Sequence, residues 1–161
     1  MLAGHLRFSL VTIVFFLSVA LPARAGGMIG QASVIDGDTI EIHGQRIRLF
    51  GIDAVESRQR CTRNGAAWNC GQDAAFALAD RIERAAIDCR GDERDRYGRL
   101  VAVCFKGTED LNRWMVAQGW AVAYRRYSVD YVAEEVAARA AGRGLWSSTF
   151  DMPWEWRKRQ R

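Results

Sequence analysis

Three carboxylates and one arginine lie close together in a short segment near the start of the chain. Asp38, Asp53 and Glu56 border strand-like stretches, and Arg48 lies between the first two. Hard cations such as Ca²⁺ bind several oxygen ligands, chiefly carboxylates, carbonyls and waters. If the two strands pair, Asp38 and Asp53 converge. The segment therefore predicts a cation site suited to acting on a phosphodiester.

Each of these residues also has an ordinary structural explanation. Asp36-Gly37-Asp38 is typical of a turn with good local hydrogen bonding, a strand arginine such as Arg48 is commonly solvated, and a glutamate such as Glu56 usually lies on the surface. No EF-hand pattern follows Asp38, so an ion would depend on residues brought together by the fold. The complete set supports the prediction better than any single member.

A second arginine with matching chemistry occurs in Asp95-Arg-Tyr-Gly-Arg99. The guanidinium forks of Arg48 and Arg99 match the oxygens of a phosphorane-like transition state, which carries more charge than the substrate. Glu56 is a candidate to orient or deprotonate an attacking water. The alternative for Arg99 is an ordinary charged turn.

Several catalytic schemes are excluded by absent motifs. After residue 25 the sequence has one histidine, no Gly-x-Ser-x-Gly and no phosphate loop. A two-histidine ribonuclease scheme and a covalent nucleophile are therefore not indicated. Metal-assisted attack by water remains.

Residues 1–25 have the pattern of a signal peptide. Arg7 precedes an apolar run over 8–21, and Ala23-Arg24-Ala25 has the small-x-small pattern of a cleavage site. The run is about 14 residues, shorter than the roughly 20 that a spanning helix needs. We expect export with cleavage, to the periplasm or the medium; an N-terminal membrane anchor is the alternative.

The remaining residues, 26–161, fit one domain with a real core. The whole chain has 23 Lys and Arg against 19 Asp and Glu. Two basic residues fall within 1–25, which leaves 21 against 19. Nucleic-acid binding must therefore rest on local clustering. The basic end of the chain is one candidate, but we expect a solvated terminus with Trp154 and Trp156 docked on the body.

All four cysteines lie after residue 25, where export favours disulfides. Four cysteines allow three pairings. Cys89 and Cys104 lie at similar distances on either side of the turn around Tyr97-Gly98, so a cross-strand bond fits. Cys61 and Cys70 would then close a small loop. The alternative is a zinc site, although the sequence has no C-x-x-C.

The hydrophobic pattern predicts an order of elements. Three strands over 28–52 come first, then a helix over 72–84, two strands over 87–89 and 100–105, and two helices over 110–118 and 129–141. His43-Gly44 is a plausible tight turn, and 54–71 is expected to be a loop. The order favours an α+β fold: a five-stranded OB-fold β-barrel with three α-helices.

With these features the sequence resembles the staphylococcal nuclease (thermonuclease) family. Five segments match in order and together cover most of 29–146: Ile35-Asp-Gly-Asp-Thr-Ile40, Arg48-Leu-Phe-Gly-Ile-Asp-Ala-Val-Glu56, Asp95-Arg-Tyr-Gly-Arg99, the helix over 111–119 and Gly144-Leu-Trp146. The cysteines at 61 and 70 and the ending Met152-Pro-Trp-Glu-Trp-Arg157 look like the exported bacterial branch of that family.

The resemblance implies a Ca²⁺-dependent endonuclease that cleaves DNA and RNA and leaves 3′-phosphates, and we expect a monomer with no stable protein partner. Asp38 and Asp53 match the family's metal carboxylates, and position 54 contributes a backbone carbonyl. The remaining matches are the phosphate-binding arginines Arg48 and Arg99, the presumed general base Glu56, and the aromatic pocket positions Tyr97 and Tyr124.

The sequence departs from the family pattern at three positions. Ala54 replaces a threonine, with little expected loss because the ligand there is the backbone carbonyl. Val55 replaces a proline in the loop that carries Glu56, and Arg126 stands where the second pocket tyrosine is expected. The rival hypothesis is a noncatalytic OB-fold module that binds nucleic acid or protein, which would have no need of the complete set of carboxylates and arginines.

Overall fold

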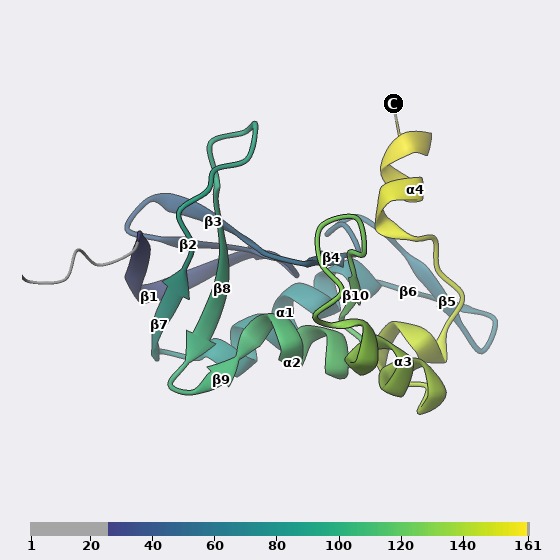
Figure 1. The fold of residues 1–161 in the computed structure, drawn as a ribbon. Helices are drawn as coiled ribbons and strands as arrows, with labels where there is room; N and C mark the ends of the chain where they lie inside the picture. The colour runs from purple at the N-terminus through teal and green to yellow at the C-terminus, as the bar shows by residue number, and fades with distance from the viewer. Residues whose placement is uncertain (1–25, 161) are drawn as a thin grey trace, which may run out of the picture.

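Five strands close into a mixed β-barrel in the computed structural model, which describes residues 26–160 (Figure 1). The order β3-β2-β1-β7-β8 is antiparallel throughout, and a parallel β3–β8 pair closes the barrel. The predicted α+β barrel is thereby confirmed. The barrel strands are β1 (Gly27–Asp36), β2 (Thr39–Ile42), β3 (Gln45–Leu49), β7 (Ala86–Arg90) and β8 (Leu100–Lys106).

The β2–β3 hairpin sets the strand register that positions Arg48. His43 and Gly44 both have positive φ, 51° and 76°, as a two-residue turn that follows the strand twist requires. Ile47 and Leu49 are fully buried in the core, and Arg48 between them points to the opposite face. The register pairs Arg48 with Thr39, which brings its side chain beside the end of β1.

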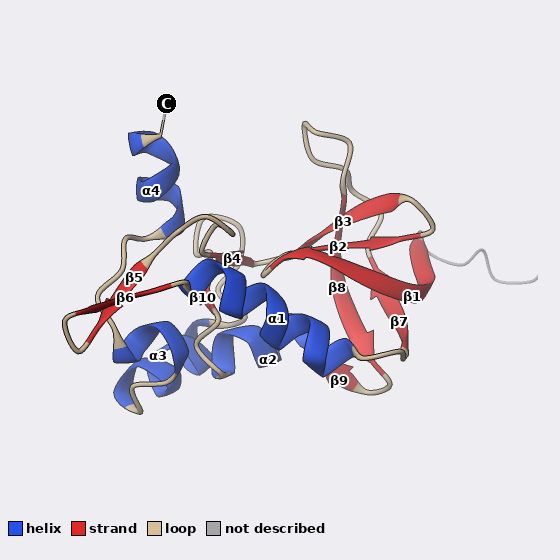
Figure 2. Cartoon of the chain, turned by 180° about the vertical axis from the view of Figure 1, so that it is seen from behind, coloured by secondary structure: helices blue, strands red, loops and turns tan. Residues whose placement is uncertain are grey.

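The helices differ in number from the prediction. α1 (Cys70–Ile82), α2 (Leu111–Ala117) and α3 (Val132–Ala140) confirm the three expected helices with shifted ends. Asp110 caps α2 by accepting a hydrogen bond from the Arg113 backbone N–H (2.9 Å). α1 packs against β1 and α2 against β8, and in Figure 2 both helices lie beside the barrel, to its left.

A fourth α-helix corrects the predicted solvated terminus. α4 (Pro153–Arg159) follows the short 3₁₀ helix η1 (Gly144–Ser147). It begins with Pro153, has Glu155 in its first turn and carries basic residues in its last turn. These are favourable helix start and end signals, which the basic, aromatic composition of this segment had obscured. Trp154 is docked on the body, as expected, through its contact with Tyr124.

Shorter strands complete the fold: β4 (Ile52–Ala54), which pairs with β10 (Ala121–Ala123), the β5–β6 hairpin (Cys61–Arg63 and Ala66–Trp68) and β9 (Glu109–Asp110). The hairpin lies inside 54–71, which was expected to be a loop. Its strands are too short for alternation to show in the sequence, although Asn64 and Gly65 have the paired positive φ values, 51° and 77°, of a tight hairpin turn.

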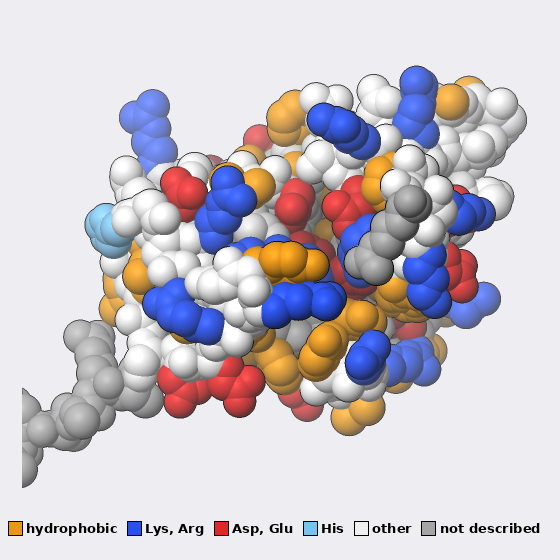
Figure 3. Space-filling model, turned by 90° about the horizontal axis from the view of Figure 1, so that it is seen from above, with side chains coloured by type: hydrophobic (Ala, Val, Ile, Leu, Met, Phe, Trp, Pro, Cys, Tyr) orange, Lys and Arg blue, Asp and Glu red, His pale blue; other side chains and the backbone are white. Residues whose placement is uncertain are grey.

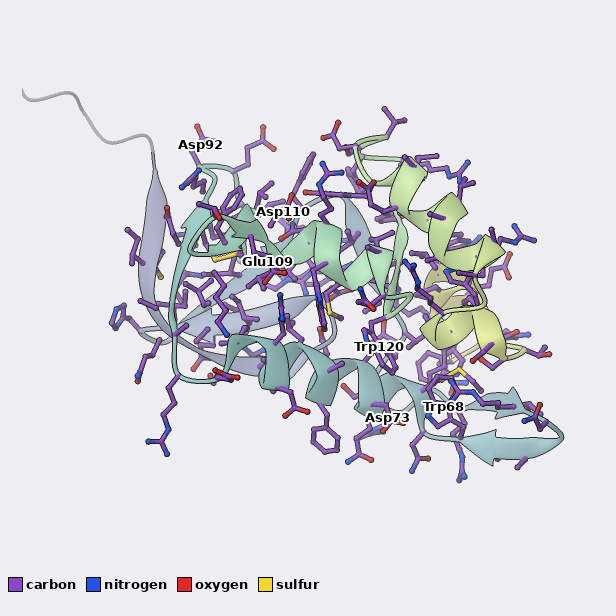
Figure 4. All side chains as sticks on the ribbon, turned by 90° about the horizontal axis from the view of Figure 1, so that it is seen from below. Trp68, Asp73, Asp92, Glu109, Asp110 and Trp120 are labelled. Atoms are coloured by element: carbon purple, nitrogen blue, oxygen red, sulfur yellow. A yellow bond between two sulfur atoms is a disulfide. The ribbon has the colours of Figure 1, made fainter. Side chains whose placement is uncertain are left out.

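The β5–β6 hairpin is fixed to the helical layer by Trp68. Its indole N–H donates to Asp73 in α1, and its ring meets Trp120 edge to face, with centroids 6.3 Å apart. Figure 4 shows these three side chains together on the lower side of the molecule. The hairpin therefore anchors the loop that leads from β4 to α1.

Both predicted disulfides are present. Cys61 in β5 is bonded to Cys70 at the start of α1, and Cys89 is bonded to Cys104 across the β7–β8 pair. All four cysteines are used, which rules out the zinc alternative. Each cross-link is of a size that typically contributes about 2–4 kcal/mol to stability.

The predicted signal peptide lies outside the described residues. Within 26–160, no helix combines the length and apolar character needed to cross a membrane.

Candidate active site

A cleft of about 900 Å³ gathers most of the predicted site residues on one face of the molecule. Figure 3 shows that face from above, with acidic side chains surrounded by Lys and Arg. Besides the cysteines, the sequence predicted eight site residues, and seven of them line the cleft: Asp38, Arg48, Ala54, Glu56, Tyr97, Arg99 and Tyr124. The eighth, Asp53, is fully buried.

The turn between β1 and β2 is pressed against β4. A Cβ at Gly37 would lie 2.7 Å from the Ala54 Cβ, so a side chain there would push the two apart. Asp38 Oδ2 accepts a hydrogen bond from the Ala54 backbone N–H (2.6 Å). Asp36 accepts one from the Asp38 backbone N–H (3.1 Å), which is the ordinary turn role considered for it. The turn thereby fixes Asp38 next to the Asp53–Ala54 pair.

Arg48 joins the two aspartates. Its guanidinium donates to Asp38 Oδ1 and to Asp53 Oδ1, the latter at 2.6 Å. Asp38 is only 2% exposed and Asp53 not at all. Burial raises the pKa of Asp38 to about 6, because the nearby Arg48 charge offsets only part of the cost of burying a carboxylate.

Arg157, in α4, is the residue that the sequence analysis missed. Its Nη2 donates to Asp53 Oδ2 (2.7 Å), and its Nη1 donates to Glu56 Oε1 (2.7 Å) and to Asp53 Oδ1 (3.1 Å). Burial opposes its charge, but hydrogen bonds to Asp53 and Glu56 outweigh that cost and raise the pKa of Arg157. Both oxygens of Asp53 are therefore held by arginines.

Gln59 connects the Glu56 loop to the segment that precedes α4. It is 1% exposed, its backbone N–H donates to the Glu56 carbonyl (2.7 Å), and its amide donates to the Asp151 carbonyl (2.6 Å). A Cβ on Gly71 would meet the Glu56 carbonyl oxygen at 1.8 Å, so a side chain at 71 would displace this loop. The Glu56 loop and α4 are thus fixed to each other independently of Arg157.

Arg99 reaches the cleft from the end of the 90–99 turn, directly before β8. Its Nε donates to Asp95 Oδ2 (2.7 Å), and its Nη1 donates to the Thr39 hydroxyl (3.3 Å). Thr39 in turn donates to Asp38 Oδ1 (3.2 Å). Arg99 is therefore linked to the carboxylate cluster through one hydroxyl, although 61 residues separate it from Asp38 in the sequence.

The two predicted aromatic positions have different surroundings. Tyr97 is 68% exposed at the tip of its turn. Tyr124 stacks on Trp154 of α4, with ring centroids 5.6 Å apart and planes at 8°, and meets Tyr127 edge to face. One face of Tyr124 is thus covered by the C-terminal helix.

The oxygen atoms at the base of the cleft are the type of ligand that a hard divalent cation binds. Within residues 26–160, no three His, Cys, Asp or Glu side chains surround a common point, so a cation would need Asp38, Asp53, a backbone carbonyl and water. Asp38 and Asp53 are buried carboxylates, and a bound cation would place positive charge beside them. The residues therefore fit such an ion.

A closed OB-fold barrel with buried carboxylates and arginine forks at one end has the architecture of a phosphodiester-hydrolysing nuclease.

The comparisons with known proteins agree. Residues 46–148 match the family described as staphylococcal nuclease homologue, and the chain belongs to the staphylococcal nuclease family. It is 32% identical to the micrococcal nuclease of Shigella flexneri over 92% of this chain and 90% of that protein. It is 28% identical to an uncharacterized endonuclease of Haemophilus influenzae over 92% of this chain and 83% of that one.

A further relative is named for a biosynthetic role and not as a nuclease. The chain is 42% identical to the succinoglycan biosynthesis protein ExoI of Rhizobium meliloti over 74% of its own length, and it spans 64% of that protein.

Proposed function

We propose that the protein is a Ca²⁺-dependent endonuclease that hydrolyses the phosphodiester bonds of DNA and RNA and leaves 3′-phosphates. The observation that carries the proposal is the convergence of Asp38, Asp53 and Glu56 with Arg48 and Arg157 at one cleft. Arg99, directly before β8, lines the same cleft. A pure binding module would have no need of carboxylates where a polyanion binds.

Asp38 and Asp53, with the Ala54 carbonyl, would hold the cation. Bound Ca²⁺ would supply positive charge to the scissile phosphate and to the buried carboxylates. Both oxygens of Asp53 now accept from arginines, so these guanidiniums and the cation would share the carboxylate's charge.

Glu56 is the general base in this proposal. Its carboxylate lines the cleft with 33% of the side chain exposed, so water can reach it. Arg157 binds Oε1, which fixes the orientation of the carboxylate. Glu56 would accept a proton from the attacking water.

Arg48 and Arg99 bind the non-bridging phosphate oxygens in this proposal. Arg48 lies in β3 and Arg99 directly before β8, the strand that pairs with β3, so the two guanidiniums can bind two oxygens of one phosphate. A preorganised donor of this kind contributes about 2.7–4 kcal/mol to transition-state stabilisation.

The test is plasmid degradation with Ca²⁺ and with EDTA, for the wild type and for Glu56→Gln. We expect degradation only by the wild type with Ca²⁺. Equal degradation under all conditions would remove the mechanism. Tight oligonucleotide binding without turnover in the presence of Ca²⁺ would support the noncatalytic module instead.

We also propose that the protein is exported. The two disulfides within 26–160 suit an oxidising compartment, and the sequence of residues 1–25 matches a signal peptide. Cell fractionation with mass analysis of the mature N-terminus tests this. Cytoplasmic protein with reduced thiols would contradict it.

A further inference from the structure

A second cavity, of about 690 Å³, lies beside the active-site cleft between α4 and the segment that follows β10. It is called the α4 groove here. Its side chains are predominantly basic and aromatic, with one acidic member, and it is lined by Arg96, Ala123, Tyr124, Arg125, Arg126, Glu135, Arg139, Met152, Trp154, Arg157 and Lys158.

Most of the positive charge in the α4 groove lacks an acidic partner, although Arg96 and Arg139 lie over the rings of Tyr97 and Trp146. Glu135 is bound by Arg125 (2.6 Å) and by the Ala123 backbone N–H (2.7 Å), so its charge is already neutralised. Arg157 is engaged with the cleft carboxylates. The other four basic side chains make no ion pair with any carboxylate among residues 26–160: Arg96, Arg126, Arg139 and Lys158. All four are exposed.

The α4 groove is continuous with the cleft. Four residues line both: Arg96, Tyr124, Arg126 and Arg157. The stacked rings of Tyr124 and Trp154 lie along the shared boundary. A row of cations beside aromatic rings is the combination that single-stranded nucleic acids bind, through phosphate contacts and base stacking. Continuity with a phosphodiester cleft favours this occupant over an acidic protein or a membrane.

We propose that the α4 groove binds the phosphate backbone of a single strand that runs out of the active site, with Arg126, Arg139 and Lys158 as its phosphate contacts. The inference rests on the proposed function, because it concerns the same substrate. These three residues are not among the site positions that the family resemblance implied, and Lys158 gives the C-terminal helix a role in strand binding. The groove makes the enzyme favour long single strands over dinucleotides.

The test uses binding without cleavage. The full-length mature protein is titrated in EDTA with a fluorescent oligothymidylate of about 12 nucleotides, within the roughly 4–16 that OB folds cover. Arg139→Gln with Lys158→Gln should weaken binding and reduce the salt slope by about 1.4, since each phosphate contact on a single strand contributes about 0.7. Dinucleotide hydrolysis with Ca²⁺ should stay at the wild-type rate.

A matched control removes the same charge elsewhere. Arg84 and Arg90 are exposed, Arg84 just after α1 and Arg90 at the end of β7, and β7 lies away from α4 in Figure 1. Arg84→Gln with Arg90→Gln should leave the salt slope almost unchanged. Equal losses in the two double variants would overturn the proposal, because net charge would then explain the effect.

Failure of this inference is distinguishable from failure of the proposed function. If dinucleotides are cleaved but Arg139→Gln with Lys158→Gln binds the longer strand like the wild type, the groove assignment is wrong and the nuclease assignment stands. If nothing is cleaved but the groove variant still loses strand binding, the groove assignment stands alone. Loss of binding to anionic lipid vesicles with unchanged oligonucleotide binding would overturn the proposal in favour of a membrane surface.

Discussion

The two sides of the active site are built in different ways. The barrel side comes from residues 36–56, a single hairpin and the strand after it, so Asp38, Arg48 and Asp53 are near neighbours in sequence. The C-terminal side consists of α4, whose Arg157 reaches Asp53 and Glu56 from more than a hundred residues away. The comparison shows that most of the chemistry is encoded locally, with Arg48 binding Asp38 and Asp53, whereas α4 supplies the second arginine on Asp53 and the one on Glu56.

After Glu56, the largest effect should come from Arg99, at the end of the 90–99 turn. Arg99→Gln should lower kcat by about 10²–10³-fold, the loss typical of one transition-state donor. Its ion pair with Asp95 is partly exposed, so stability should hardly change. Steady-state kinetics with Ca²⁺ and thermal unfolding measure the two effects. A variant that loses its fold, or keeps its kcat, would contradict this role.

Removing Arg157 tests the C-terminal side directly. Arg157→Gln should reduce kcat by about 10–100-fold, because groups that orient reacting or ligating carboxylates typically have effects of that size. KM for a dinucleotide should change less than kcat. The matched control is Arg159→Gln, on the same helix, whose partner Asp151 is partly exposed. Similar losses in both variants would show that the helix, and not the Arg157 contact, matters.

Gln59 tests whether the two sides are held together mechanically. Gln59→Leu should lower the free energy of unfolding by about 1–3 kcal/mol, since it removes the amide donor from the part-buried Asp151 carbonyl. Urea denaturation measures this change. An unaltered unfolding midpoint would mean that α4 is held by its aromatic and ionic contacts alone.

The smallest effect is expected for Asp36, on the barrel side. Asp36→Asn should change kcat by less than about threefold, because the aspartate accepts one local backbone hydrogen bond that an asparagine oxygen can also accept. The same steady-state assay measures it. A large loss would give Asp36 a place in the cation site that the structure does not indicate.

Sequence patterns were sufficient for the barrel side because its signals are local. Alternating β-branched residues and the His43-Gly44 turn set the register, and the register alone brings Arg48 beside Asp38. The disulfide pairings followed from similarly short-range spacing. The β5–β6 hairpin could not be predicted from the sequence, because three-residue strands show no periodicity. The number of helices was also underestimated.

Arg157 could not be assigned from sequence for a different reason. Its neighbours Lys158 and Arg159 make the segment look like a solvated basic end, and nothing local distinguishes the one arginine that turns inward. That choice depends on the burial of Asp53 and on the Gln59–Asp151 hydrogen bond, which are properties of the folded molecule. Pro153 marks a helix start, but it does not show which way the helix faces.

The central claim is that Glu56 activates water at a cation-dependent phosphodiester site. The most direct measurement is the single-turnover cleavage rate of an end-labelled oligonucleotide at saturating Ca²⁺, for the wild type and Glu56→Gln, with the product ends identified. The account predicts 3′-phosphate ends, no cleavage in EDTA and a rate about 10²–10⁴-fold lower for the variant. A Glu56→Gln protein that cleaves at the wild-type rate would contradict it.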